Sequence, residues 1–196
     1  MKILYLHGLG SGANANTACK LTEYFANQDI QILAPELPIM PKDAFSFILD
    51  IQLKEQPNII IGASLGGLYA RFLHGPFKIL INPAFAAEDV IKAVGYGTHS
   101  FFVPRQTGEL VYQIDETFVS QLQEIIDSQS KFFDDELRAE TFALFGTKDK
   151  VISNYEKYFQ LYRSAQLKLI DAEHRLSNKN ISENLIPLIE ELRSLL

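Results

Sequence analysis

Short runs of hydrophobic residues recur along the chain, and longer mixed segments separate them. Residues 2–6, 58–62 and 77–81 are mostly apolar, and the run at 58–62 is rich in isoleucine. A strand that is covered on both faces has this pattern, because neither of its faces meets water. The runs that predict buried strands are 2–6, 30–33, 58–62, 77–81, 141–145 and 167–170.

Amphipathic segments lie between these runs. In residues 41–56, the side chains of Phe45, Ile48, Leu49 and Leu53 form a stripe with the spacing of one helix face. The predicted helices are 14–27, 41–56, 65–74, 154–162 and 181–195. Strands that alternate with helices indicate an α/β fold, in which helices cover both faces of a mostly parallel sheet.

Residues 83–135 interrupt this alternation. They predict a short helix at 88–94, a hairpin with strands at 101–103 and 109–112, and a helix at 117–128. We expect residues 88–135 to form a small cap-like insertion over the sheet. Residues 1–196 then form a single domain, since the chain contains no repeat, linker or low-complexity tract.

The composition fits a soluble globular protein. The chain has 196 residues, of which 47% are hydrophobic and 21% charged, and its formal net charge is −6. An acidic chain is a poor general ligand for nucleic acid or anionic membranes, so we expect neither as a partner. The single cysteine, Cys19, excludes an intramolecular disulfide. No apolar run is long enough to span a membrane, and we expect a cytoplasmic location.

The segment Gly62-Ala63-Ser64-Leu65-Gly66 joins the predicted central strand to the next predicted helix. This G-x-S-x-G pattern is typical of the nucleophile elbow of α/β-hydrolases, a sharp turn that exposes a serine. Gly62 and Gly66 lack Cβ atoms, so strand and helix can cross closely there. The alternative is a chance match in a glycine-containing loop. The strand and helix on either side favour the elbow, and we predict Ser64 as the catalytic nucleophile.

An activated serine needs a base, and the base needs an acid that orients it. Of the four histidines, His174 alone follows a late predicted strand, in the sequence IDAEHRL. Asp149, in FGTKDKV, follows the strand before it, and the chain order Ser, Asp, His is that of α/β-hydrolases. We therefore predict His174 as the base and Asp149 as the acid. Asp171 and Glu173 are rivals, but they lie too close to His174 along the chain.

The loop after the first predicted strand, His7-Gly8-Leu9-Gly10, can present a backbone N–H group to an oxyanion. We predict the N–H groups of Leu9 and Leu65 as the oxyanion hole, with Gly10 as the alternative to Leu9. We expect His7 to brace this loop by hydrogen bonds and not to transfer protons.

Several stretches together resemble the YqiA-type esterase family of small bacterial α/β-hydrolases (UPF0227). They are YLHGLGSG near the start, ELP at 36–38, IIIGASLGGLYA at the elbow, ILINPA at 79–84, FGTKDKV at 145–151 and AEHRLS at 172–177. The resemblance implies a lightly capped hydrolase of carboxylic esters or acyl thioesters, with Ser64, Asp149 and His174 as its catalytic residues. Leu9 and Gly10 stand where the family often has an aromatic residue and serine, and Ala63 stands where serine is frequent.

The main hypothesis is a serine carboxylic-ester hydrolase that acts on a small-molecule acyl ester or thioester through an acyl-enzyme. This chemistry needs no metal and no organic cofactor. The first alternative is an acyltransferase, in which another acceptor replaces water. The second is a non-catalytic binding protein on a hydrolase scaffold. The sequence leaves the physiological substrate, the acyl chain length and the oligomeric state open.

Overall fold

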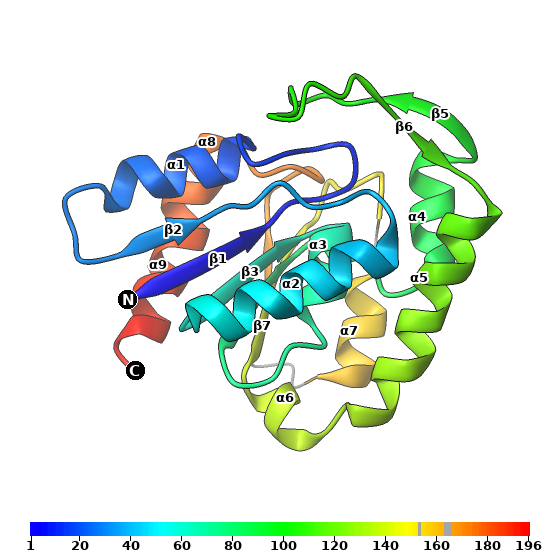
Figure 1. Ribbon diagram of the computed structural model, residues 1–196. Coiled ribbons are helices and arrows are strands. Elements are labelled where there is room, and N and C mark those ends of the chain that lie inside the picture. The colour runs from blue at the N-terminus through cyan, green and yellow to red at the C-terminus, as the bar shows by residue number, and fades with distance from the viewer. Residues whose placement is uncertain (153, 163–165) are drawn as a thin grey trace.

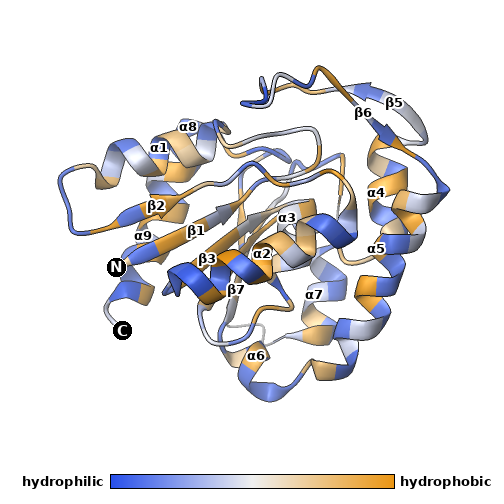
Figure 2. Cartoon of the chain, viewed as in Figure 1, coloured by the Kyte–Doolittle hydropathy of each residue, from blue (hydrophilic) through white to orange (hydrophobic). Residues whose placement is uncertain are grey.

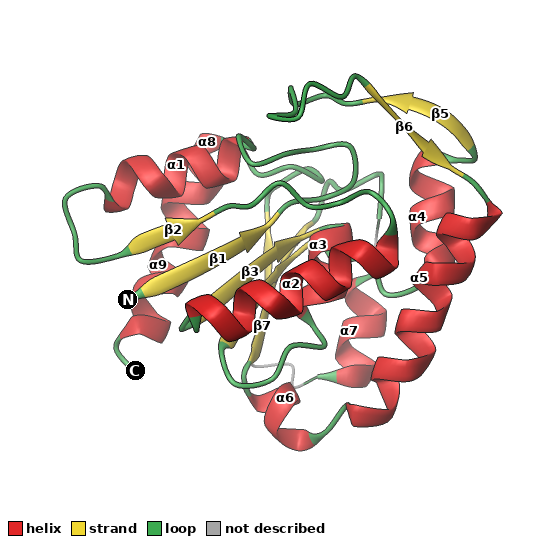
Figure 3. Ribbon diagram, in the orientation of Figure 1, coloured by secondary structure: helices red, strands yellow, loops and turns green. Residues whose placement is uncertain are grey.

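The computed structural model describes residues 1–152, 154–162 and 166–196, and a six-stranded sheet lies at its centre (Figures 1 and 3). Its strands are β1 (Lys2–Leu6), β2 (Gln31–Leu33), β3 (Ile59–Ala63), β4 (Phe77–Ile81), β7 (Thr141–Gly146) and β8 (Leu167–Ile170). Every strand begins and ends within one residue of the hydrophobic run that predicts it. The sequence prediction of the sheet is therefore confirmed.

The strand order is β2-β1-β3-β4-β7-β8, and every neighbouring pair is parallel. All six strands therefore end at the same edge of the sheet (Figure 3). In parallel α/β sheets this carboxyl edge is where functional loops gather. The segments that follow β1, β3, β7 and β8 contain the residues that the sequence singles out.

Two hydrophobic layers cover the sheet, one on each face. Helices α1 (Asn16–Phe25) and α9 (Ile186–Arg193) pack on one face. Helices α2 (Pro41–Glu55), α3 (Leu65–Ala70) and α7 (Tyr155–Leu161) pack on the other. Figure 2 shows hydrophobic strands between helices that carry both kinds of residue. No helix in the described ranges combines the length and the apolarity that crossing a membrane requires.

Some helix details differ from the sequence prediction. On α2, Phe45 and Ile48 are buried, but Leu53 is 77% exposed, because α2 contacts the core through its first turns. Helix α3 ends at Ala70 and not at residue 74. The C-terminal helical segment begins earlier, with α8 (Asn178–Asn180), because the Ser177 hydroxyl caps it by accepting the Asn180 N–H. A π-helical turn then joins α8 to α9.

The segment between β4 and β7 contains α4 (Ala87–Val94), the hairpin strands β5 (Gly97–Ser100) and β6 (Val111–Ile114), α5 (Glu116–Gln129) and α6 (Asp135–Ala139). The prediction of a hairpin is right, but its strands lie farther from the turn than 101–103 and 109–112. Residues 101–110 instead form a long loop. Within it, the Phe102 N–H donates to the carbonyl of Gly10. Gly10 lies in the loop that follows β1 (the β1 loop), so the Phe102 N–H bonds to this loop and not to the opposite strand of the hairpin.

Candidate active site

Ser64 occupies a strained turn between β3 and α3. Its backbone torsions are φ 53° and ψ −115°, a region that side-chain-bearing residues rarely adopt. Such a conformation costs about 1–3 kcal/mol and persists only when its surroundings enforce it. Here the Ser64 N–H donates to Ile81, and the Ser64 carbonyl accepts from Ala84. The end of β4 therefore holds the turn in place.

Close backbone packing at Gly66 fixes the position of α3. A Cβ atom on Gly66 would overlap the carbonyl groups of Leu6 and His7, and one on Gly62 would overlap the carbonyl of Gly66. Only glycine fits at such a distance, as the sequence predicts for the elbow. The helix therefore begins directly over the end of β1, and Ser64 faces the loop that follows β1.

His174 and Asp149 lie next to each other beyond the ends of β8 and β7. The Nδ1 atom of His174 is 2.8 Å from Oδ2 of Asp149. The other carboxylate oxygen of Asp149 accepts the backbone N–H groups of Val151 at 2.7 Å and Ile152 at 3.1 Å. The Asp149 side chain is only 1% exposed. A carboxylate in this position makes Nδ1 the donor, which leaves Nε2 without a proton as an available base.

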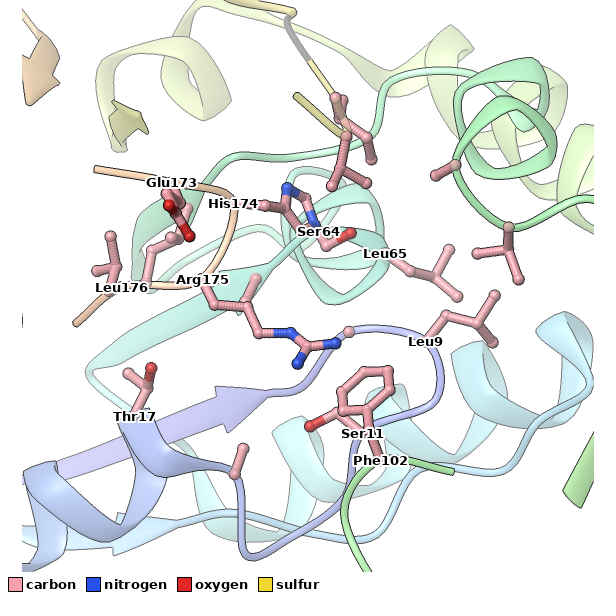
Figure 4. A pocket seen from close by; sticks show the side chains of 18 of the residues that line it. Leu9, Ser11, Thr17, Ser64, Leu65, Phe102, Glu173, His174, Arg175 and Leu176 are labelled. Atoms are coloured by element: carbon pink, nitrogen blue, oxygen red, sulfur yellow. The ribbon is translucent and has the colours of Figure 1, made fainter. Parts of the chain in front are cut away.

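The two rival carboxylates do not contact the His174 ring. Asp171 forms an exposed ion pair with Lys148 at 2.6 Å. The Glu173 side chain points away from the imidazole in Figure 4. Among the described residues, the carboxylate that pairs with the His174 ring is that of Asp149. The local geometry therefore favours Asp149 over both rivals.

A pocket of about 1020 Å³ opens at this edge of the sheet. Ser64 and His174 both line it, and Figure 4 shows the imidazole beside the Ser64 side chain. Among the described residues, the His174 ring forms a side-chain hydrogen bond with Asp149 and none with Ser64. In free enzymes such catalytic hydrogen bonds are often long and tighten when substrate binds. The pocket brings together a serine hydroxyl and an available imidazole nitrogen.

The predicted oxyanion groups lie at the same pocket. Leu9, from the loop that follows β1, and Leu65, at the start of α3, both line it (Figure 4). In the described part of the chain, the backbone hydrogen bonds of turns, loops and helix caps include none from the N–H of Leu9 or Leu65. Leu65 is the first residue of α3, so its N–H has no acceptor within the helix either. Both donors are therefore available to a bound oxygen atom.

His7 braces the β1 loop, as the sequence predicts. Its ring is buried, with Nδ1 2.9 Å from the carbonyl of Gly8, and its Nε2 accepts the N–H of Leu37 at 3.0 Å. This pair of bonds requires the neutral ring with its proton on Nδ1. Burial is the largest cause that lowers the pKa of His7, and the Arg105 cation lowers it further.

A buried ion pair between Glu36 and Arg105 connects this loop to residues 101–110. The two side chains are 3.2 Å apart and 11% and 4% exposed. Glu36 also accepts the backbone N–H groups of Ala13 and Gln106. The sequence does not predict this role of Glu36, because its partners Ala13 and Gln106 lie 23 and 70 residues away. The pair ties the loop after β1 to the segment above the pocket.

Asn82 is a second residue whose role the sequence did not reveal. It directly follows β4, is fully buried and adopts φ 42°. Its side-chain amide donates to the carbonyl groups of Glu173 at 3.1 Å and His174 at 2.9 Å. Its side-chain oxygen accepts the N–H of Gly146 at 2.7 Å. Asn82 therefore fixes the His174 loop against the end of β7.

No three side chains of the acidic, histidine or cysteine type converge as a metal site within the ranges that the structure describes. The pocket contains polar groups from Ser64, His174 and backbone amides, and its walls are largely apolar. This arrangement can bind a small molecule and present a hydroxyl, a base and N–H donors to it.

The chain has the α/β-hydrolase fold, as comparison with solved structures shows. Monoacylglycerol lipase from Paleococcus ferrophilus is 18% identical, with a TM-score of 0.69 over 98% of this chain and 94% of that one. Alpha/beta hydrolase domain-containing protein 10 from mouse is 16% identical, with a TM-score of 0.68 over 98% and 89%. The esterase domain of a Rhodothermus marinus protein is 17% identical, with a TM-score of 0.62 over 97% and 86%.

Comparison of the sequence with models of protein families identifies the family of the chain. The model of the uncharacterised protein family UPF0227 matches residues 2–192, so the chain belongs to that family. The resemblance that the sequence motifs suggest is thereby confirmed. Among curated proteins, no sequence matches the chain.

The lowered pKa of His7 predicts a loss of stability in mild acid. An unfolded histidine takes up a proton near pH 6.5, whereas the buried ring resists protonation until a lower pH. The free energy of unfolding should therefore fall as pH drops below about 6.5, by up to about 1.4 kcal/mol per pH unit, until the folded ring is also protonated. In urea unfolding experiments between pH 7.5 and 5, the free energy of unfolding of His7→Asn should not show this fall. The exposed His74→Asn serves as a control, and an identical pH slope in wild type and His7→Asn would contradict the assignment.

The contacts of Asn82 predict that Asn82→Asp loosens the His174 loop. Aspartate tolerates the positive φ and can still accept from Gly146, but it cannot donate to the two carbonyl groups. We expect the free energy of unfolding to drop by about 2 kcal/mol. The downfield proton resonance of His174 Nδ1–H should broaden in proton NMR spectra. The exposed Asn27→Asp should change neither quantity. A sharp, unshifted resonance in Asn82→Asp would refute the positioning role.

Proposed function

We propose that this protein is a serine hydrolase of carboxylic esters, with Ser64, His174 and Asp149 as its catalytic triad. The observation that carries the proposal is the 2.8 Å contact between His174 and the buried Asp149, at a pocket that also holds the strained Ser64. A buried carboxylate that orients a histidine beside a serine at an elbow is the arrangement of serine hydrolases. Packing alone does not require these three groups together.

The reaction begins with attack of Ser64 Oγ on the ester carbonyl. His174 Nε2 takes the hydroxyl proton as the Oγ–C bond forms, and Asp149 stabilises the resulting imidazolium through Nδ1–H. The C–O bond of the ester then breaks, and His174 gives the proton to the leaving alcohol. Water attacks the acyl-enzyme by the same route, which releases the acid and restores Ser64. Each proton that leaves a nucleophile therefore reaches a leaving group through His174.

The N–H groups of Leu9 and Leu65 would stabilise the oxyanion of the tetrahedral intermediate. Among the described residues, neither N–H donates to a backbone group, and both residues line the pocket that contains Ser64 (Figure 4). One such donor contributes roughly 3 kcal/mol of transition-state stabilisation. The bracing of His7 and the Glu36–Arg105 pair supports this role, because both fix the loop that contains Leu9.

Apolar residues around the pocket support an acyl group as the part of the substrate that it binds. Side chains from the β1 loop, α3, β4, α4 and residues 101–112 contribute: Leu9, Leu65, Ile81, Val90, Phe102 and Tyr112. Burying each CH₂ of an acyl chain against such walls is worth about 0.8 kcal/mol. The names of the lipase and esterase structures that share the fold are consistent with this class of substrate.

The proposal predicts that Ser64→Ala removes turnover. We expect kcat for a 4-nitrophenyl ester series of increasing acyl length to fall by at least about 10³-fold, because no other group can form the acyl-enzyme. The exposed Ser120→Ala is the matched control and should retain full activity. Near-full activity of Ser64→Ala in folded protein would refute the proposal. Accumulation of a transfer product in place of free acid would indicate an acyltransferase.

The same assay tests the acid with a matched pair of variants. Asp149→Asn should lower kcat by roughly 10³-fold or more, because asparagine cannot hold the productive tautomer or stabilise the imidazolium. Asp171→Asn removes the rival carboxylate, which contacts Lys148, and should leave kcat within about twofold. The reverse order of effects would assign the acid to Asp171.

A further inference from the structure

The side chain that follows His174 lies across the candidate pocket. Arg175 lines the pocket, and Figure 4 shows its side chain extending from the His174 loop toward Phe102. The guanidinium carbon lies 3.7 Å from the centre of the Phe102 ring. Stacking of this kind uses the flat face of the guanidinium and leaves the N–H groups at its edge available. Phe102 therefore holds a cation in a defined place near the nucleophile.

Arg175 differs from the other described arginines in its contacts. Each of the others donates to a carbonyl or carboxylate oxygen: Arg71, Arg105, Arg138 and Arg193. Within the described residues, Arg175 has no such hydrogen bond and no ion pair, and the residue is exposed. The ring contact orients the guanidinium, while its five N–H donors remain free to bind a ligand.

The charges around the pocket are opposite to the charge of the whole chain. Lys148, Lys150 and Arg175 line it, against the carboxylate of Glu173, although the formal net charge of the chain is −6. Lys148 is already paired with Asp171. Burial raises the pKa of the Tyr112 hydroxyl, and the Arg175 cation opposes that rise, so its charge acts within the pocket. Among the described residues, Lys150 and Arg175 form no ion pair, and two such cations at one pocket give this acidic protein a local attraction for anions.

We propose that Arg175 is a specificity-determining residue that binds an anionic group of the substrate, so that the preferred ester bears a carboxylate or a phosphate. This inference rests on the proposed ester hydrolysis at Ser64 and names its substrate class. The planar guanidinium matches both oxyanions, since two parallel N–H groups can donate to two oxygen atoms. Neutral esters lack this contact and depend on the apolar walls alone.

The test compares esters that differ in charge. Three 4-nitrophenyl esters share the same three-methylene acyl chain and end in a carboxylate (glutarate), a phosphonate (4-phosphonobutanoate) or a methyl group (pentanoate). A second pair carries the charge on the leaving group: the butyrate esters of 4-hydroxybenzoate and of its methyl ester. For each pair, kcat/KM of the anionic ester is divided by that of the neutral one. Intrinsic reactivity cancels when this ratio is compared between wild type and variants.

We expect Arg175→Gln to lower the ratio by about fivefold or more for the acyl-side esters or for the leaving-group pair, and Arg175→Lys to lower it less. A larger effect with glutarate than with the phosphonate assigns a carboxylate, and the reverse assigns a phosphate. The matched control Arg193→Gln replaces an arginine on α9 outside the pocket lining and should leave every ratio unchanged. Ratios that are unchanged in Arg175→Gln for all pairs would overturn the inference.

A binding measurement separates this inference from the proposed function. Glutaryl 4-nitroanilide and pentanoyl 4-nitroanilide are amide analogues, and their dissociation constants are measured by calorimetry with wild type and Arg175→Gln. Tighter binding of the glutaryl compound to wild type alone supports the anion site even if no ester is hydrolysed. Ester hydrolysis without any charge preference, in either rate or binding, refutes the anion site and leaves the proposed hydrolase intact.

Discussion

The turn at Ser64 depends on backbone packing that excludes any larger residue at Gly66. Helix α3 begins where its backbone touches the carbonyl groups of Leu6 and His7, and this contact leaves Ser64 at a positive φ. The strain of about 1–3 kcal/mol is offset by hydrogen bonds from the Ser64 backbone to Ile81 and Ala84. The Ser64 backbone is therefore held in place, and its side chain faces the pocket at this edge.

Strand order explains how the remaining groups reach that position. Ser64 follows β3, while Asp149 follows β7 and the His174 loop follows β8, so β4 lies between them in the sheet. The end of β4 spans this gap. Its residue Ile81 accepts the N–H of Ser64, and the next residue, Asn82, bonds to β7 through Leu144 and to the His174 loop. On the other side, Glu36 and Arg105 tie the β1 loop to residues above the pocket. The pocket is thus bounded by loops that share buried polar contacts.

The sequence predicts the local features well and the long-range ones poorly. Continuous hydrophobic runs locate all six strands, because a buried parallel strand leaves few alternatives for its residues. The elbow pattern and the chain order of serine, aspartate and histidine predict residues that the structure places at one pocket or its rim. Asn82, Glu36 and Arg175 lie in stretches that resemble the family, but these stretches do not predict their contacts, since their partners come from distant parts of the chain. The predicted hairpin strands lie too close to the turn, because the hydrogen bond between Phe102 and Gly10 is also long-range.

Covalent labelling tests the central claim most directly, since it requires no knowledge of the substrate. A fluorophosphonate reacts with a serine that a neighbouring base activates, and it mimics the tetrahedral intermediate within the oxyanion hole. We predict that the intact mass of the wild-type protein rises by one phosphonyl group, that the modified peptide contains Ser64, and that folded His174→Gln reacts far more slowly. Folded wild-type protein that remains unlabelled, or is labelled at a serine other than Ser64, would contradict the account and favour a binding protein on a hydrolase scaffold.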